Sequence, residues 1–214
     1  MVSVELMVFD FDGTLVNSGE DIARSVNFVL RHFQLPAKDH REIMGFIGDG
    51  VVSLIERSLG TAHIDKLDEA LELFSRYYPE HMLDTSGLYP GVVEILEHFR
   101  NKKKIIVTNK RHYFASRMAD ALKISSYFEE IIGRDNAGYV KPDHRLLRSI
   151  LDKYAANSRR TVVIGDGCND IILAKDAGVW SCAFLNGLSL KEDLVRLEPD
   201  FTYNDILELK YLFH

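Results

Sequence analysis

Apolar positions along the chain fall into short continuous runs and longer runs at helical spacing. The first short run, Val4 to Phe9, is broken only by Glu5 and predicts a buried strand. Further short runs predict strands at Ile105–Thr108, Ile131–Ile132, Val162–Ile164 and, last, Cys182–Leu185. Helical spacing between them predicts helices at Val92–Phe99, Tyr113–Leu122, Asp143–Tyr154 and Asp170–Ala177. Strands that alternate with helices predict a parallel sheet covered on both faces.

The segment between the first two strands has only helical patterns. Ser18 and Asp21 are spaced like a capping pair at the start of a helix that ends before Pro36. A second amphipathic stripe has the residues Leu67, Leu71, Phe74 and Tyr78. The linkers are Val16–Ser18 and the turn-rich stretch Asp84–Gly91. We therefore predict an α/β domain of residues 1–16 and 88–214, with an all-helical domain of residues 17–87 inserted after the first strand.

Asp10 and Asp12 are the first candidates for chemistry, because they stand where the first strand ends. Side-chain alternation along a strand sends both carboxylates to the same side. Two anions this close repel each other unless a cation lies between them or one is protonated. The pair suggests a hard divalent metal and a carboxylate free to attack phosphorus. The alternative is an ordinary Asp-Gly turn after a strand.

Polar residues also follow the later strands. Thr108, Asn109 and Lys110 end the second strand, and Gly165 and Asp166 end the strand at Val162–Ile164, with Asp170 four positions further on. Ligands of parallel α/β sheets bind beyond the carboxyl ends of the strands. We therefore expect these distant positions to converge on one rim.

Four segments together resemble the motifs of the haloacid dehalogenase-like hydrolase superfamily, in the same order and across nearly the whole chain. They are Asp10–Leu15, Ile105–Lys110, Val140–Pro142 and Val162–Asp170. The resemblance implies a three-layer α/β/α Rossmann-like core, with the helical insert as a cap over the rim. The third motif departs slightly, since His144 stands where the family often has a second proline.

The resemblance and the chemistry together suggest roles for the acids. Asp10 would attack phosphorus and form an aspartyl-phosphate. Asp12 would protonate the leaving alcohol, then activate water, and its backbone carbonyl would bind the metal beside Asp10. Asp166 and Asp170 would complete a Mg²⁺ site, with Asp170 bound directly or through water; alternatively Asp170 would orient Lys141, and it also suits a helix cap.

Three further residues would bind the phosphate. Thr108 and the Asn109 amide would hold its oxygens, and Lys141 would stabilise the negative transition state. Alternatively, Thr108 is an ordinary strand threonine, and Lys141 is an exposed lysine at the start of a helix.

Within the superfamily, Thr108–Lys110, Phe46–Gly50 and Leu88–Val92 resemble the phosphoglycolate phosphatase group. Gly48, Asp49 and Gly50 match a loop that closes the site, or form a plain interhelical turn. Lys110 and Arg57 are candidates to pair with a substrate carboxylate, or surface charges. We expect phosphoglycolate or a similarly small phosphomonoester as substrate; nucleotide monophosphates, pyrophosphate and sugar phosphates stay open.

Three other activities share parts of this pattern. A phosphomutase uses the same four motifs and differs in what accepts the phosphoryl group. A haloalkanoic acid dehalogenase needs neither magnesium nor a second acid, so Asp12 argues against it. A phospho-accepting signalling receiver has an acidic cluster, a Thr and a Lys, but no use for the helical insert.

Composition limits the partners. The 214 residues are 46% hydrophobic and 27% charged, with a formal net charge of −6, which argues against a nucleic-acid surface. No apolar run has spanning length and no basic, apolar leader is present, so neither membrane insertion nor secretion is expected. Cys168 and Cys182 form no metal-type or disulfide pattern, which fits a reducing cytoplasm. We expect a cytoplasmic monomer or homodimer that acts on a small phosphorylated metabolite.

Overall fold

The computed structural model describes residues 1–214 and has a six-stranded sheet at its centre. The strand order is β5-β4-β1-β6-β7-β8, and every neighbouring pair is parallel. The strands are β1 Leu6–Phe9, β4 Lys103–Val107, β5 Glu130–Ile132, β6 Thr161–Gly165, β7 Trp180–Phe184 and β8 Phe201–Tyr203. The first strand lies in the interior of the sheet, with Val8 level with Ile105 of β4 and Val163 of β6. The predicted parallel sheet is confirmed.

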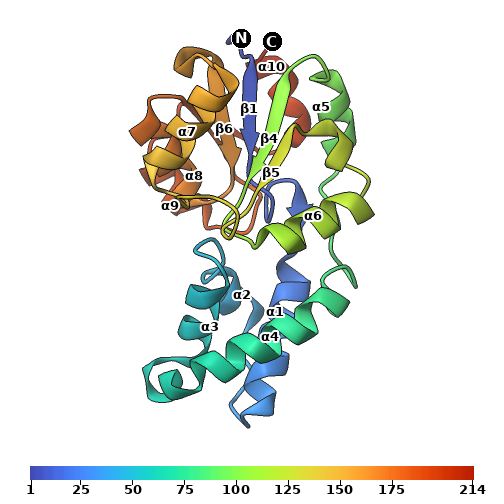
Figure 1. The fold of residues 1–214 in the computed structure, drawn as a ribbon, viewed down its shortest axis with the longest axis vertical. Helices are drawn as coiled ribbons and strands as arrows, with labels where there is room; N and C mark the ends of the chain where they lie inside the picture. The colour runs from blue at the N-terminus through green and yellow to red at the C-terminus, as the bar shows by residue number, and fades with distance from the viewer.

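Helices cover both faces of the sheet (Figure 1). Met7 and Phe9 point into the larger apolar cluster, which contains side chains of α5, α6 and α10. Leu6 and Val8 point to the opposite face, into a cluster with side chains of α7 and α8. The helices of the core are α5 Val92–His98, α6 His112–Ala121, α7 His144–Tyr154, α8 Cys168–Ala177, α9 Lys191–Arg196 and α10 Leu209–Leu212. This alternation along β1 produces the predicted three-layer core.

The helical insert lies beyond the carboxyl ends of the strands, in the lower half of Figure 1. Its helices are α1 Gly19–His32, α2 His40–Met44, α3 Val51–Leu59 and α4 Leu67–His81, with a 3₁₀ turn at Thr61–Lys66. The first predicted helix of the insert buries Val26 and Leu30 (α1), and the second amphipathic stripe buries Phe74 and Tyr78 (α4), while Leu67 and Leu71 are half-buried. α1 and α4 pack against each other and form the interior of the insert.

The ends of the insert differ from the prediction, which placed no strand there. Val16–Asn17 (β2) and Gly87–Leu88 (β3) form a short antiparallel pair where the chain leaves and re-enters the core. A two-residue strand is too short to produce a periodic pattern, so the sequence could only indicate a linker. The prediction that Cys182–Leu185 is the last strand is also wrong, because β8 follows it.

The predicted capping pair at the start of α1 is wrong as well. The Ser18 hydroxyl donates to the Asp12 carboxylate at 2.5 Å and makes no capping bond. Asp21 instead accepts bonds of 2.6–3.2 Å from the backbone amides and hydroxyls of Thr85 and Ser86. Asp21 thus finds its partners on the second crossing of the chain, and Ser18 finds its partner at the end of the first strand, so neither side chain caps its own helix.

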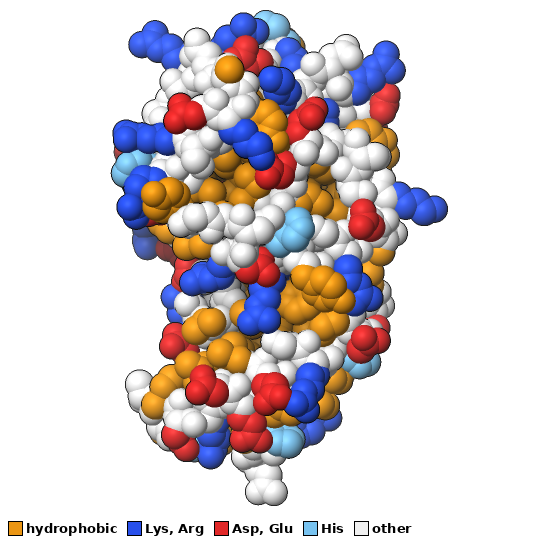
Figure 2. All heavy atoms as spheres, in the orientation of Figure 1, with side chains coloured by type: hydrophobic (Ala, Val, Ile, Leu, Met, Phe, Trp, Pro, Cys, Tyr) orange, Lys and Arg blue, Asp and Glu red, His pale blue; other side chains and the backbone are white.

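The surface carries both signs of charge. Figure 2 shows Lys and Arg side chains interspersed with Asp and Glu over the face in view. No helix combines the length and the apolar character that crossing a membrane requires.

Candidate active site

The carboxyl ends of β1, β4 and β6 bring the candidate residues together. Asp10 directly follows β1, Thr108 follows β4, and Asp166 follows β6. Because these three strands are parallel neighbours, their ends share one edge of the sheet. The expected convergence of distant positions is therefore what the structure shows.

Three carboxylates and one lysine form the buried centre of this edge. One oxygen of each of Asp10, Asp166 and Asp170 lies within 4.8 Å of the others. The Lys141 ammonium, with its side chain only 3% exposed, lies 2.7 Å from Asp10 and 2.6 Å from Asp170. Lys141 stands ahead of α7 and not at its start, since Asp143 caps that helix. The exposed helix-start reading of Lys141 is thus wrong.

Burial makes this concentration of negative charge costly. Burial, with a further contribution from the charge of Asp170, raises the pKa of Asp10 to about 8, against the opposing charge of Lys141. Burial also raises the pKa of Asp166 to about 6, although hydrogen bonds from Leu188 and Thr14 act in the opposite direction. One lysine does not neutralise three carboxylates, so a further cation would restore the charged forms.

The surroundings of the acids fit a small, hard cation. Thr14 and the Leu188 amide each donate to Asp166 at 2.7 Å and fix its orientation. A Cβ on Gly13 or on Gly187 would lie 2.1 Å or 2.2 Å from atoms of Asp166. These glycines let the backbone close in on an all-oxygen group of ligands, which is the donor type that Mg²⁺ prefers.

The Asp12 carboxylate is not part of this acidic group and has partners of its own. Lys110 donates to its two oxygens at 2.9 Å and 3.0 Å, and Ser18 donates to one of them. Lys110 also contacts the Tyr78 hydroxyl of α4 at 2.6 Å. Burial opposes the charged form of Lys110, but the charge of Asp12 outweighs it and raises the lysine pKa. Lys110 is only 6% exposed, so the surface-charge alternative is wrong.

Asn109 joins three parts of the site. Its side-chain amide donates to the carbonyl of Gly48 in the insert at 2.8 Å and to the carbonyl of Lys141 at 3.1 Å. Its Oδ1 accepts from the Lys141 amide at 3.1 Å. Thr108 is buried beside it, and its hydroxyl accepts from the Lys110 amide at 3.2 Å. Asn109 therefore fixes the segment that carries Lys141 and connects it to the insert.

The Gly48–Gly50 loop contacts the core. The Asp49 carboxylate accepts from Asn169 at 2.7 Å, and its carbonyl accepts from Arg134 at 2.8 Å. Arg57 forms an exposed ion pair with Asp49 and is not among the residues that line the pocket. Both Gly48 and Gly50 have positive φ and line the pocket.

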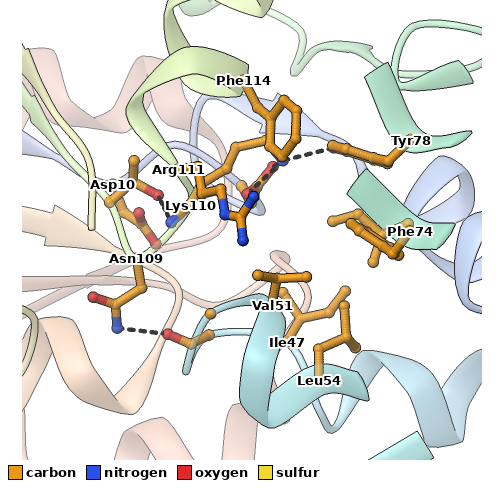
Figure 3. A pocket seen from close by; sticks show the side chains of 15 residues that line it. Asp10, Ile47, Val51, Leu54, Phe74, Tyr78, Asn109, Lys110, Arg111 and Phe114 are labelled. Carbon is orange, nitrogen blue, oxygen red and sulfur yellow. Dashed lines mark hydrogen bonds and ion pairs between the residues drawn. The ribbon is translucent and has the colours of Figure 1, made fainter. Parts of the chain in front are cut away.

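A pocket of about 70 Å³ lies between the insert and this edge of the core. Figure 3 shows Asp10 and Asn109 on one side of it and Ile47, Val51, Leu54 and Phe74 on the other. Its polar wall comes from the core, and its apolar wall comes mainly from the insert. A phosphate at Asp10 would thus project the rest of its molecule toward the insert.

Comparison with known proteins identifies the family. The family model described as haloacid dehalogenase-like hydrolase matches residues 7–184. The chain belongs to this family. It is 34% identical to a phosphoglycolate phosphatase of Colwellia psychrerythraea and 32% identical to one of Haemophilus influenzae; each alignment covers 96% of this chain, and 95% and 96% of the relative.

Solved structures of haloacid dehalogenase-like hydrolases share the whole fold. A protein from Haemophilus somnus described as a predicted phosphoglycolate phosphatase matches with a TM-score of 0.94 at 27% identity. The match covers 99% of both chains. The predicted resemblance to this superfamily is therefore confirmed, and the chain is an enzyme of the hydrolase type.

Sequence reasoning missed two residues that line the pocket, Tyr78 and Arg111, and two that contact the insert loop, Asn169 and Arg134. Tyr78 was assigned to an apolar stripe, and its hydroxyl reaches Lys110 because that stripe faces the core. Arg111 directly follows the Thr108–Lys110 segment and lines the pocket. Its position just beyond a strand end was the available signal. Asn169 and Arg134 had none, because their partners are on the insert loop.

Proposed function

We propose that this enzyme is a magnesium-dependent phosphatase that hydrolyses phosphoglycolate or a similarly small phosphomonoester through an aspartyl-phosphate. The observation that carries the proposal is the separation of two acids. Asp10 lies in the acidic group beside Lys141, while Asp12 turns away to Lys110 and Ser18. Two carboxylates in different surroundings suit two different roles. The names of the relatives support the substrate class.

The two acids divide the reaction into two displacements. An Asp10 oxygen attacks phosphorus, the bond from phosphorus to the leaving oxygen breaks, and Asp12 gives that oxygen its proton. Asp12 then takes a proton from water as the water oxygen attacks the phosphorus of the aspartyl-phosphate. The bond from phosphorus to Asp10 breaks, so inorganic phosphate leaves and the Asp10 carboxylate is restored.

The residues of the centre would hold Mg²⁺ and phosphate together. The carboxylates of Asp10, Asp166 and Asp170 and the Asp12 carbonyl are the proposed metal ligands. When bound, Mg²⁺ supplies positive charge that offsets the anionic phosphate. The Thr108 hydroxyl and the Asn109 amide would hold phosphate oxygens, and Lys141 would place its charge against them.

The helical insert would act as the cap that reads the substrate. In this proposal residues 1–16 and 88–214 are the catalytic domain, and residues 17–87 are the cap. The Gly48–Gly50 loop supports it, since it contacts Asn109 and Asn169 beside the proposed phosphate site. The apolar insert wall favours a small substrate over a phosphosugar, so hydrolysis is preferred to the mutase alternative.

A turnover assay with metal and chelator tests the proposal. We expect phosphate release from phosphoglycolate with Mg²⁺, its loss with excess chelator, and its return when Mg²⁺ is added back. Asp10→Asn should abolish it, since an amide is a poor nucleophile. Full phosphate release in excess chelator would contradict the proposed magnesium dependence.

A further inference from the structure

Two cationic side chains line the pocket, and only one of them is neutralised. Lys110 is held by both oxygens of Asp12. Arg111 forms no ion pair, and its one side-chain hydrogen bond is a contact of 3.3 Å from Nη1 to the Ser75 hydroxyl. Figure 3 shows its guanidinium extending into the space between the core residues and Val51. Arg111 thus offers most of its donors to the pocket.

The backbone explains why Arg111 points there. It is the residue before α6, with extended φ/ψ of −60° and 136°, and it follows β4 by only four residues. The contact with Ser75 of α4 places the guanidinium where the core meets the insert. A substrate whose phosphate lies at Asp10 would direct its other end toward this junction.

The remaining walls offer a ligand little polar contact. Six apolar side chains line the pocket: Ile22, Ile47, Val51, Leu54, Phe74 and Phe114. The Tyr78 hydroxyl is already engaged by Lys110. The hydroxyl groups of a sugar would lose water here without gaining partners, and each such loss costs binding free energy.

We infer that Arg111 binds a carboxylate of the substrate, and that the substrate is a short phosphorylated carboxylic acid with few or no hydroxyl groups. This inference rests on the proposed phosphatase function and assigns its specificity. A guanidinium matches a carboxylate with two parallel hydrogen bonds, which a neutral group of the same size cannot accept as well. Arg111 takes the role expected of Lys110 or Arg57, which are occupied by Asp12 and Asp49.

Two esters of similar size separate the carboxylate from the phosphate. Phosphoglycolate carries the carboxylate, and 2-hydroxyethyl phosphate replaces it with a neutral alcohol. Wild-type enzyme should have the higher kcat/KM on phosphoglycolate. Arg111→Met should lower that value roughly 10- to 100-fold, the loss expected for a charge-assisted hydrogen-bonded pair. The same change should alter the value for the neutral ester less than about 3-fold, within the scatter of an uninvolved site.

A control variant and a binding measurement complete the test. Arg117→Met removes an exposed guanidinium of α6, the helix that Arg111 precedes; Arg117 contacts Tyr113, and its loss should leave the rates on both substrates unchanged. The inhibitor 3-phosphonopropionate carries the same two anionic ends but no ester bond to cleave. Its inhibition constant against an aryl phosphate should rise in Arg111→Met by a factor similar to the loss on phosphoglycolate.

The outcomes distinguish the two proposals. Equal losses on both esters in Arg111→Met, or no loss on either, would overturn the role of Arg111. A wild-type preference for a sugar phosphate or pyrophosphate would overturn the substrate class. Absence of Mg²⁺-dependent hydrolysis of every ester would instead contradict the phosphatase function itself. If Arg111→Met did not fold, Arg111→Lys would be measured instead. The lysine provides only a point charge, so this variant should keep only part of the wild-type preference for phosphoglycolate over the neutral ester.

Discussion

At the residue scale, the site depends on an imbalance of charge. Three carboxylates meet around Lys141, and burial keeps water from screening them. At a solvated loop the same carboxyl group would be an ordinary turn residue, whereas the proposed nucleophilic role of Asp10 depends on the buried charges around it. The surroundings of Asp10, rather than its identity, make it suited to attack phosphorus.

Replacing the two acids of the first motif should separate their roles. Asp10→Asn should remove both turnover and the covalent intermediate. Asp12→Asn should slow both steps by roughly 10²- to 10⁴-fold, the usual range for losing a general acid and base. Rapid-quench kinetics would measure each step, with the exposed Asp176→Asn as control. More than a few per cent of activity in Asp10→Asn would require a different nucleophile.

The sequence could predict those site residues that lie at or just beyond the ends of strands. Asp10, Thr108 and Asp166 were found because a strand pattern led directly to each of them, and Asp170 because it lies four positions after Asp166. The structure brings all four to one edge of the sheet. Lys110 was predicted to pair with a substrate carboxylate. Its actual partner, Asp12, is 98 positions away in the sequence, and only tertiary packing brings the two together.

At the element scale, α4 and the Gly48–Gly50 loop connect the insert with the chemistry. Tyr78 is buried, with its ring stacked on Phe74 and edge-on to Phe114. Its hydroxyl accepts a hydrogen bond from Lys110, and Lys110 also donates to the Asp12 carboxylate. The orientation of Asp12 therefore depends on how closely α4 packs against the core.

Removing the Tyr78 hydroxyl should weaken Asp12 in its proposed role as general acid without changing the fold. Tyr78→Phe should lower kcat on phosphoglycolate roughly 3- to 10-fold, about the value of one hydrogen bond. Rates on a series of aryl phosphates should depend more steeply on the acidity of the leaving phenol. Tyr77→Phe is the matched control, since Tyr77 stacks on Phe28 and His81 in the same helix. Equal effects of the two changes would contradict a role in orienting Asp12.

The insert loop should affect specificity more than chemistry. Gly48 and Gly50 have φ of +119° and +86°, where a side chain is strained, and a Cβ on Gly50 would lie 2.9 Å from Arg134. The strain of about 1–2 kcal/mol per residue predicts a loss in kcat/KM on phosphoglycolate of roughly 10-fold or more for the double alanine variant. An activated aryl phosphate depends less on the cap and should lose far less.

Gly60→Ala is the control for this loop, because Gly60 has φ of +71° but open space around it. It should lower stability without changing the ratio of the two substrates. Equal losses on both substrates in the double variant would show that the loop supports the core in general.

Long periodic elements were predicted well, and of the shortest strands only β5 was predicted. The strands around the site and the helices between them were found because burial on both faces leaves continuous apolar runs. β2, β3 and β8 have two or three residues each, too few to show a period. Their pairing depends on which segments the fold brings together, which a local pattern does not contain.

At the scale of the whole molecule, Asp21 links the two crossings between core and insert. Burial acts to raise the pKa of this carboxyl, but hydrogen bonds from Thr85 and Ser86 outweigh it and hold the pKa below its usual 3.8. A carboxyl whose pKa is lower in the folded than in the unfolded state stabilises the fold at pH values above its unfolded-state pKa. That contribution is lost as the pH falls through the folded-state pKa.

Asp21→Asn should therefore destabilise the protein in a pH-dependent way. At neutral pH we expect a loss of about 1–3 kcal/mol, the value of hydrogen bonds to a charged group. The melting temperature should fall by roughly 2–4 °C per kcal/mol. The difference from wild type should shrink as the pH is lowered through and below 3.8. Thermal unfolding at a series of pH values measures it, and a difference that grows in acid would contradict this role.

The most direct test of the account is the site of the phosphoryl group during turnover. The enzyme is mixed with phosphoglycolate and Mg²⁺, quenched in acid within one turnover, digested and mapped by mass spectrometry. We expect one phosphorylated peptide, with the phosphate on Asp10 and none in Asp10→Asn. Phosphate release at the normal rate with no such adduct, or an adduct on another residue, would contradict nucleophilic attack by Asp10.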